Sequence, residues 1–137
     1  SLNQLRTLDI CHNQLTELPQ SITRLNQLLE LYLLSNELRY LPEFIGQLKE
    51  LRVLNVVSNH LTSLPESLKQ LNQLEELGLG LNRLIDLPSW LGEMRQLKRI
   101  GLSSMELQVM PIFLFNLVEL EYLYLGNMET IGRWSIE

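Results

Sequence analysis

The sequence predicts an α/β fold: a right-handed solenoid arc with a parallel sheet on its concave face and short helical or 3₁₀ turns on its convex face. Leucine accounts for 35 of the 137 residues, and all five prolines follow one constant period, each after an apolar residue. A fixed period in the twenties is typical of a solenoid, whose units bury their apolar faces only against their neighbours. The prolines are Pro19, Pro42, Pro65, Pro88 and Pro111.

Aligning the sequence on the prolines gives a unit that opens Leu-x-x-Leu-x-Leu-x-x-Asn-x-Leu-x-x-Leu-Pro and closes with Ile/Leu-x-x-Leu. We interpret the chain as one domain, 1–137. It divides into a partial repeat at 1–4, full repeats at 5–27, 28–50, 51–73, 74–96 and 97–119, and a degenerate repeat or C-terminal cap at 120–137. Ile131, Trp134 and Ile136 follow the last recognisable repeat without a Leu-Pro step. We expect them to fold over the last turn.

Each unit is expected to contain a short strand followed by a short helical turn. In Leu8-Asp9-Ile10 the apolar residues alternate, so one side of the segment faces inward and the other outward. The proline suits the first helical position, because its φ is preset and no N–H is needed there. Apolar residues then recur every three positions, as at Ile22 and Leu25, which is closer to 3₁₀ than to α-helical spacing.

The repeat resembles the leucine-rich repeat family in its 23-residue Leu-Pro-x-x-Ile/Leu form, from residue 2 to about residue 128. The resemblance implies that the asparagine of each unit turns inward and hydrogen-bonds backbone groups of adjacent turns. A buried backbone group left unpaired would cost about 1–3 kcal/mol. Met105 and Met128 stand where the fifth and sixth asparagines are expected, so those turns must be held differently. The asparagines are Asn13, Asn36, Asn59 and Asn82.

The outward strand positions form columns on the concave face, and these columns supply the candidate binding residues. Exposed contiguous apolar side chains mark interaction sites, and aromatic residues are enriched among binding hot spots. We define the concave cluster as Tyr32, Leu34, Val53 and Val57, and the glycine trough as Gly78, Gly80, Gly101 and Gly126. The candidate binding residues are Tyr32, Leu34, Val53, Asn55, Val57, Glu76, Arg99, Tyr122 and Tyr124.

A structural interpretation of these residues stays open beside the functional one. Aromatic and β-branched residues suit strands in any case, and the glycines can reflect simple tolerance of small residues. On the opposite face, Phe44, Trp90 and Phe113 share one repeat position and are expected either to pack half-buried over the turn or to form a second interaction edge.

Composition argues against several classes of function. The net charge of −5 and the pI near 5.1 leave no basic stripe for nucleic acid. No apolar run approaches the length of a membrane span, which takes roughly 18 residues or more. Cys11 and His12 are neighbours whose side chains should diverge, and His60 stands apart at a different repeat position. We therefore expect no catalytic residues, no metal site and no cofactor.

The single cysteine, together with the absence of a signal peptide and of an Asn-x-Ser/Thr acceptor in this chain, favours a reducing compartment such as the cytoplasm.

Three hypotheses for function follow from the sequence. The first is a module that binds a protein or peptide on its concave face. The second is the recognition arm of a larger regulatory enzyme, because repeats of the resembled family also occur attached to GTPase, kinase or ubiquitin-ligase domains. The third is a structural or self-associating unit: Leu2 and Leu5 begin the chain inside a repeat, so we expect the first turn to be covered by preceding sequence or by a second copy.

Overall fold

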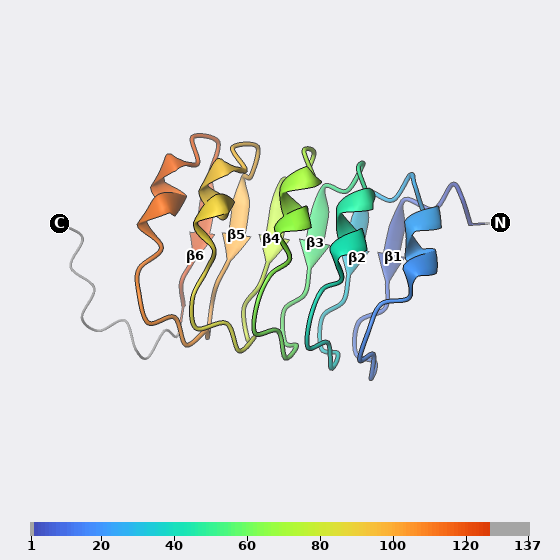
Figure 1. The fold of residues 1–137 in the computed structure, drawn as a ribbon, viewed down its shortest axis with the longest axis horizontal. Helices are drawn as coiled ribbons and strands as arrows, with labels where there is room; N and C mark the ends of the chain where they lie inside the picture. Colours follow the sequence, from blue (N-terminus) through green and yellow to red (C-terminus); the bar gives the residue numbers. More distant parts are fainter. Residues whose placement is uncertain (1, 127–137) are drawn as a thin grey trace.

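The computed structural model describes residues 2–126, which form a curved stack of similar turns (Figure 1). Each turn contributes one three-residue strand to a six-stranded sheet, and the strands are ordered β1 to β6 along the chain. Every neighbouring pair is parallel. The strands are β1 (Thr7–Asp9), β2 (Glu30–Tyr32), β3 (Val53–Asn55), β4 (Glu76–Gly78), β5 (Arg99–Gly101) and β6 (Tyr122–Tyr124).

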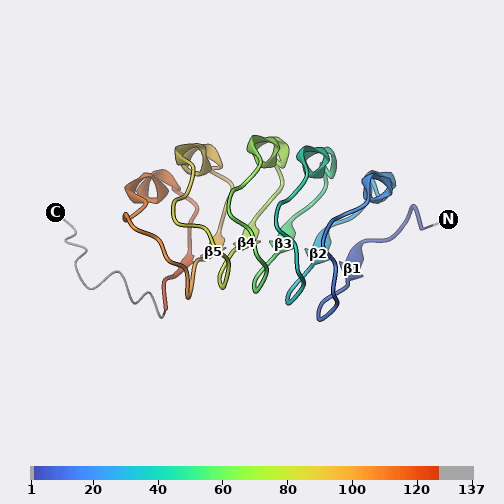
Figure 2. The same cartoon turned by 60° about the horizontal axis from the view of Figure 1, so that its bottom comes forward.

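Five 3₁₀ helices lie on the side of the stack away from the sheet, along the outer arc, while the strands follow the inner arc (Figure 2). This confirms the predicted solenoid with a parallel sheet and 3₁₀ turns. The helices are η1 (Gln20–Arg24), η2 (Glu43–Gln47), η3 (Glu66–Gln70), η4 (Ser89–Glu93) and η5 (Ile112–Asn116).

The prolines stand one position earlier than the sequence suggested. Each is the residue before its helix, as Pro42 is before η2, with φ −71° and an extended ψ of 152°. Its carbonyl accepts the first helical hydrogen bond, from Ile45 N–H at 3.0 Å. The preset φ of proline therefore still suits the site, because extended and helical backbone share that φ.

The core is the space between the sheet and the helices. The central strand residues Leu31, Leu54 and Leu77 are fully buried, and the apolar residues of the turns pack against them. Leu8, at the end of the stack, is only half-buried. On the convex side the aromatic residues Phe44, Trp90 and Phe113 are half-buried and pack against this core, as one of the two interpretations expected.

The asparagine column runs through the stack as a ladder of amide hydrogen bonds. Asn59, 3% exposed, accepts a bond from the Leu38 N–H of the preceding turn at 3.0 Å. Its amide donates to Leu33 O at 2.9 Å and to Val56 O at 3.1 Å. Asn36 and Asn82 repeat this arrangement.

Asn13 differs from the other three asparagines. It is exposed and donates only to Ile10 O and Cys11 O of its own turn.

The fifth turn is built differently. Met105 is buried in the asparagine position but offers no amide. An inverse γ-turn leads into η5, the helix of the same repeat. Pro111 has φ −76° and ψ 73°, and Ile112 N–H donates to Met110 O at 2.8 Å. The earlier turns place each such proline in an extended conformation, with ψ between 136° and 152°.

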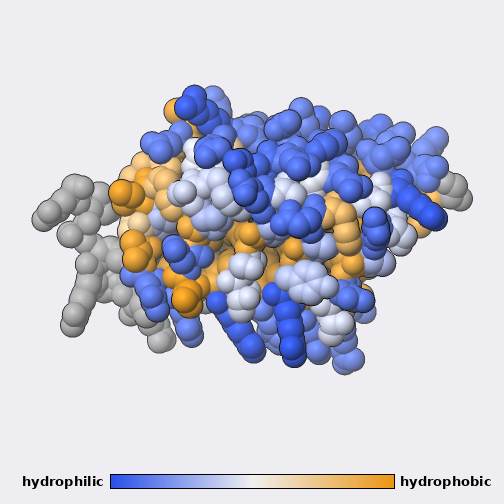
Figure 3. Space-filling model, viewed as in Figure 1, coloured by the Kyte–Doolittle hydropathy of each residue, from blue (hydrophilic) through white to orange (hydrophobic). Residues whose placement is uncertain are grey.

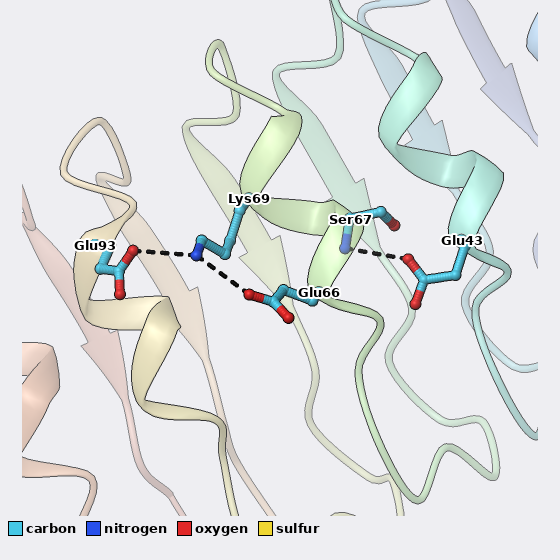
Figure 4. Close-up of polar contacts among 5 residues, drawn as sticks. All are labelled: Glu43, Glu66, Ser67, Lys69 and Glu93. Atoms are coloured by element: carbon cyan, nitrogen blue, oxygen red, sulfur yellow. Dashed lines mark hydrogen bonds and ion pairs between the residues drawn. The ribbon is translucent and has the colours of Figure 1, made fainter.

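The convex face carries polar links between neighbouring helices (Figure 4). Lys69 of η3 contacts Glu66 on its own helix and Glu93 of η4, both at 3.3 Å. The hydrogen bonds to Glu93 and then to Glu66 raise the pKa of the Lys69 ammonium. Glu43 accepts a bond from Ser67 N–H at 3.3 Å. Pairs this exposed contribute little to stability.

Candidate binding face

The sheet register brings seven of the nine predicted binding residues into two rows across the concave face. Leu34 and Val57 lie outside both rows, just after the ends of β2 and β3. One row runs along the first strand residues, from Glu30 through Val53, Glu76 and Arg99 to Tyr122. The second row runs along the last strand residues: Asp9, Tyr32, Asn55, Gly78, Gly101 and Tyr124. Nothing within the described part of the chain lies over these rows as a further element.

The concave cluster lies at the amino-terminal half of this face. Its four side chains are all half-buried, with part of each surface open to solvent. The Tyr32 hydroxyl donates to Glu30 Oε2 at 3.4 Å, and Thr7 Oγ1 donates to the same oxygen at 3.1 Å. Partial burial raises the pKa of Tyr32, and the carboxylates of Glu30, Glu76 and Asp9 raise it further. The phenol is therefore neutral and faces an acidic surrounding.

Aromatic rings mark the other half of the face. Tyr122 and Tyr124 are exposed and stacked, with ring centroids 6.1 Å apart and planes 9° from parallel. The Arg99 guanidinium carbon lies 4.9 Å from the Tyr122 ring centroid, within cation–π range. Arg99 Nη1 also lies 3.6 Å from Glu76 Oε2. Glu76, Arg99, Tyr122 and Tyr124 thus form one group, which adjoins the concave cluster because Glu76 is the register partner of Val53.

In the second row, the side chains of two polar residues accept hydrogen bonds from the backbone N–H two residues later in the chain. Asn55 Oδ1 accepts from Val57 N–H at 3.1 Å, and Asp9 Oδ1 accepts from Cys11 N–H at 3.0 Å. The bond from the Cys11 backbone lowers the pKa of Asp9. Burial raises the pKa of the Cys11 thiol, and the neighbouring Asp9 raises it further. Cys11 is therefore a poor nucleophile.

The glycine trough contains positions of two kinds. A Cβ on Gly80 would lie 2.7 Å from the backbone oxygen of Ser103, so the fourth and fifth turns could not approach as they do. A Cβ on Gly78 would press on Val57 at 3.1 Å. Gly101 and Gly126 have ordinary space, with the nearest atoms at 3.8 Å and 3.7 Å. Gly80 therefore has a packing role, and Gly101 and Gly126 leave the face open.

Sequence reasoning missed the strained backbone beside the face. One residue in each of the first five turns has a left-handed φ, between 53° and 57°. At Leu81, which is 54% exposed, this conformation carries a large apolar side chain. Of the residue types that favour this region, only histidine occurs at these positions, so His12 was the one available signal. The five residues are His12, Ser35, Ser58, Leu81 and Ser104.

The described residues contain no group of three or more His, Cys, Asp or Glu side chains that could hold a metal ion. Across residues 2–126, no helix has both the length and the apolar character that crossing a membrane requires. What the face offers chemically is a surface for contact: apolar side chains, stacked phenols, and carboxylates around a hydroxyl.

Comparison with known proteins agrees with the fold. The sequence profile of leucine-rich repeats matches residues 3–61. A leucine-rich repeat protein of Leptospira interrogans is 37% identical and superposes with a TM-score of 0.85, covering 88% of this chain. The leucine-rich repeat domain of the type III effector XopL is 28% identical, with a TM-score of 0.80 over 94% of the chain. None of the curated protein sequences compared with this chain matches it.

A third similar structure includes a bound partner. It is the leucine-rich repeat ectodomain of the plant membrane receptor kinase GASSHO1/SCHENGEN3 from Arabidopsis thaliana, in complex with CASPARIAN STRIP INTEGRITY FACTOR 2. It is 33% identical, with a TM-score of 0.78 over 92% of this chain. The chain spans less than half of each of these three proteins, at 31%, 47% and 16% of their lengths.

Proposed function

The chain belongs to the leucine-rich repeat family, and we propose that it binds a protein or peptide partner on the concave face of its sheet. The fold commonly serves as a protein interaction module, and one similar ectodomain was solved with a partner. The observation that carries the proposal is the concave cluster: four apolar or aromatic side chains, each part-exposed, on the neighbouring strands β2 and β3 or just after them.

The two groups on the face suggest how a partner is held. The concave cluster supplies an apolar anchor at β2 and β3, and the stacked tyrosines supply a second at β6. Rigid aromatic and branched side chains lose little conformational entropy on binding, which makes them effective anchors. A partner that reaches both anchors would lie across the strands.

The experiment uses substitutions that the repeat itself supplies. Asn55 occupies the column of Tyr32 and Ser103 occupies the column of Val57, so Tyr32→Asn with Val57→Ser is compatible with the fold. Peptides would be selected from a random library on the unchanged chain, and their dissociation constants measured by fluorescence polarisation. We expect the double variant to weaken binding by about 30-fold or more, the loss of one hot spot of about 2 kcal/mol.

A convex-face variant serves as the matched control. Lys49→Asn introduces the residue that Asn26 and Asn72 supply at the same repeat position, and it should leave binding unchanged. Circular dichroism would establish that both variants are folded. Peptides that bind the double variant undiminished but lose affinity for the Lys49 variant would move the site to the convex face.

A further inference from the structure

The edge of the sheet at which the strands begin has positive charge at one end and mixed charge at the other. The residues just before the six strands are Arg6, Leu29, Arg52, Glu75, Lys98 and Glu121. Before the first three strands this row holds no acidic residue, whereas before the last three acidic and basic residues alternate. Figure 3 shows hydrophilic surface along this edge, which is its upper border, over the loops that lead from the helices to the strands.

The charges beside the later strands neutralise one another. Lys98 Nζ lies 3.1 Å from Glu75 Oε2, and Arg99 Nη1 lies 3.6 Å from Glu76 Oε2. Both pairs line a hollow of about 400 Å³ at the edge. A charged group of a partner would have to compete with these internal pairs, so this part of the edge is a poor place for one to bind.

A second hollow, of about 520 Å³, lies beside the first three strands, and we call it the arginine hollow. It is lined by Arg6, Asn26, Gln27, Leu29, Glu50 and Arg52. Both arginines are exposed, and no ion pair within residues 2–126 includes either of them. Glu50 supplies the one carboxylate of this lining. The arginine hollow therefore has excess positive charge, in a chain whose net charge is −5.

The spacing of the two arginines suits one small anion. The residues that follow them both pair in register with Glu30, so Arg6 and Arg52 lie two strands apart. Neighbouring strands are about 4.8 Å apart, which separates the two backbones by roughly 10 Å. Half-buried Leu29 lies between them in the row. A carboxylate above Leu29 has two oxygens and can accept hydrogen bonds from both guanidinium groups.

We propose that the arginine hollow binds an aspartate or glutamate side chain of the same protein or peptide partner whose apolar side chains contact the concave cluster. This rests on the proposed function and specifies the chemistry of the partner. The two sites are continuous, because Arg52 precedes Val53 of the concave cluster and both residues line the neighbouring hollow. A partner with an acidic residue close to an apolar one would engage both sites.

A carboxylate fits the charge of the arginine hollow better than a phosphate group does. Two guanidinium groups and the single carboxylate of Glu50 leave one positive charge in excess. Glu30 adds a further carboxylate on the adjoining strand. A phosphorylated side chain has a charge of about −1.5 to −2 at neutral pH, so these two carboxylates would repel it more strongly than they repel a carboxylate.

The test uses the peptides selected on the unchanged chain. The arginine variant contains Arg6→Gln and Arg52→Gln, which remove the charge but keep a polar side chain at two exposed positions. We expect it to weaken binding by about 10-fold, as the loss of a hydrogen bond to a charged group commonly does. Added salt should lower the affinity of the unchanged chain more steeply than that of the arginine variant.

A control variant removes two positive charges from the opposite edge, where the loops run from strand to helix. It contains Arg39→Thr and Arg83→Gln, the residues that Thr16 and Gln14 supply at the same repeat positions. At physiological ionic strength, charges more than about 8 Å from a ligand are largely screened, so we expect this variant to bind as tightly as the unchanged chain. Circular dichroism would establish that both variants are folded.

Changes in the peptide complete a double-mutant cycle. Each aspartate or glutamate of a selected peptide is replaced in turn by asparagine or glutamine. We expect one such replacement to weaken binding to the unchanged chain by about 10-fold and to leave binding to the arginine variant unaltered, because both changes remove the same contact.

The outcomes separate this inference from the proposed function. Peptides weakened by Tyr32→Asn with Val57→Ser but not by the arginine variant would overturn the inference and leave the proposed function intact. Peptides weakened by the arginine variant alone, or by neither variant, would overturn both. An equal loss in the control variant would contradict a local contact at the arginine hollow. Tighter binding of a peptide with phosphoserine in place of its acidic residue would assign the hollow to phosphate and overturn the inference.

Discussion

The second to fourth turns and the fifth turn share one apolar frame but hold their bends by different means. In the former, a buried asparagine amide joins three backbone groups of adjacent turns, as Asn59 joins Leu38 N–H to two carbonyls. In the fifth, the thioether of Met105 takes that place, and a thioether donates no hydrogen bond.

The pairing of the loops shifts in the fifth turn as well. Gln108 N–H donates to Ile85 O, which occupies the same position in the preceding repeat. In the fourth turn, Arg83 N–H donates to Leu61 O, which stands just after the equivalent position, His60. The fifth turn therefore makes this loop bond from another repeat position, because the equivalent of Arg83 is Glu106 and not Gln108.

The difference shows that a turn can keep the strand and helix of the repeat without the buried asparagine amide. Where the amide network is present, the outer positions can be polar, because the bend is fixed by directional bonds in the interior. Where it is absent, the γ-turn at Pro111 closes the bend, and apolar residues such as Val109 and Ile112 gather on the outside. The fifth turn therefore has a γ-turn at Pro111 and no asparagine amide.

Breaking the amide network should have the largest effect. Asn59→Ala leaves buried Leu38 N–H without its partner and removes one of the two amide donors to Leu33 O. We expect unfolding to require about 3 kcal/mol less free energy, at the upper end for a buried unpaired group. Asn13→Ala, at an exposed position bonded only within its own turn, should lose less than about 0.5 kcal/mol. Urea denaturation measures both. Equal losses would mean that the amides act only locally.

Pushing the fourth and fifth turns apart should lower the free energy of unfolding by somewhat less. Gly80→Ala places a Cβ against Ser103 O of the fifth turn, and we expect a loss of about 2 kcal/mol, within the usual range for overpacking. Gly101→Ala meets nothing closer than 3.8 Å and serves as the control. The same denaturation series compares them. A harmless Gly80→Ala would show that the fifth turn shifts freely against the fourth.

Restoring the asparagine amide in the fifth turn should change stability least, and it should raise stability where the other substitutions lower it. Met105→Asn introduces the residue of the other turns and is expected to stabilise the chain by about 1 kcal/mol, as substitutions toward a repeat consensus commonly do. Met94→Asn buries an amide at a position where no repeat uses one, and it should destabilise. Thermal melting distinguishes the two. A lower melting temperature for Met105→Asn would mean that the γ-turn excludes the ladder geometry.

The sequence predicts well whatever recurs. The 23-residue spacing placed the strands, the 3₁₀ turns and the buried leucines, because each position has the same neighbours in every turn. The inward asparagine came from the family resemblance. Met105 signalled that the fifth turn would differ, and that turn does differ in its pairing and at Pro111.

Features that depend on the backbone of the neighbouring turn could not be predicted from the sequence. The need for Gly80 arises from where the Ser103 carbonyl lies, and the left-handed φ of Leu81 is imposed by a bend common to all turns. The one-residue shift of the prolines has a similar cause: proline φ fits two backbone states, and only the hydrogen bond from the helix selects between them. The binding role of the concave residues remains a prediction, since part-exposed apolar side chains on a strand serve packing and recognition alike.

Contacts between the elements of the described chain occur only between adjacent turns, strand with next strand and helix with next helix. A disturbance at β1 therefore reaches β6 only by passing through every turn between them, and each end can open without the middle. A ligand lying across the strands would contact several turns at once and would link turns that otherwise have no contact with each other. Its binding should slow hydrogen exchange most at the ends of the solenoid, far from the residues where its affinity arises.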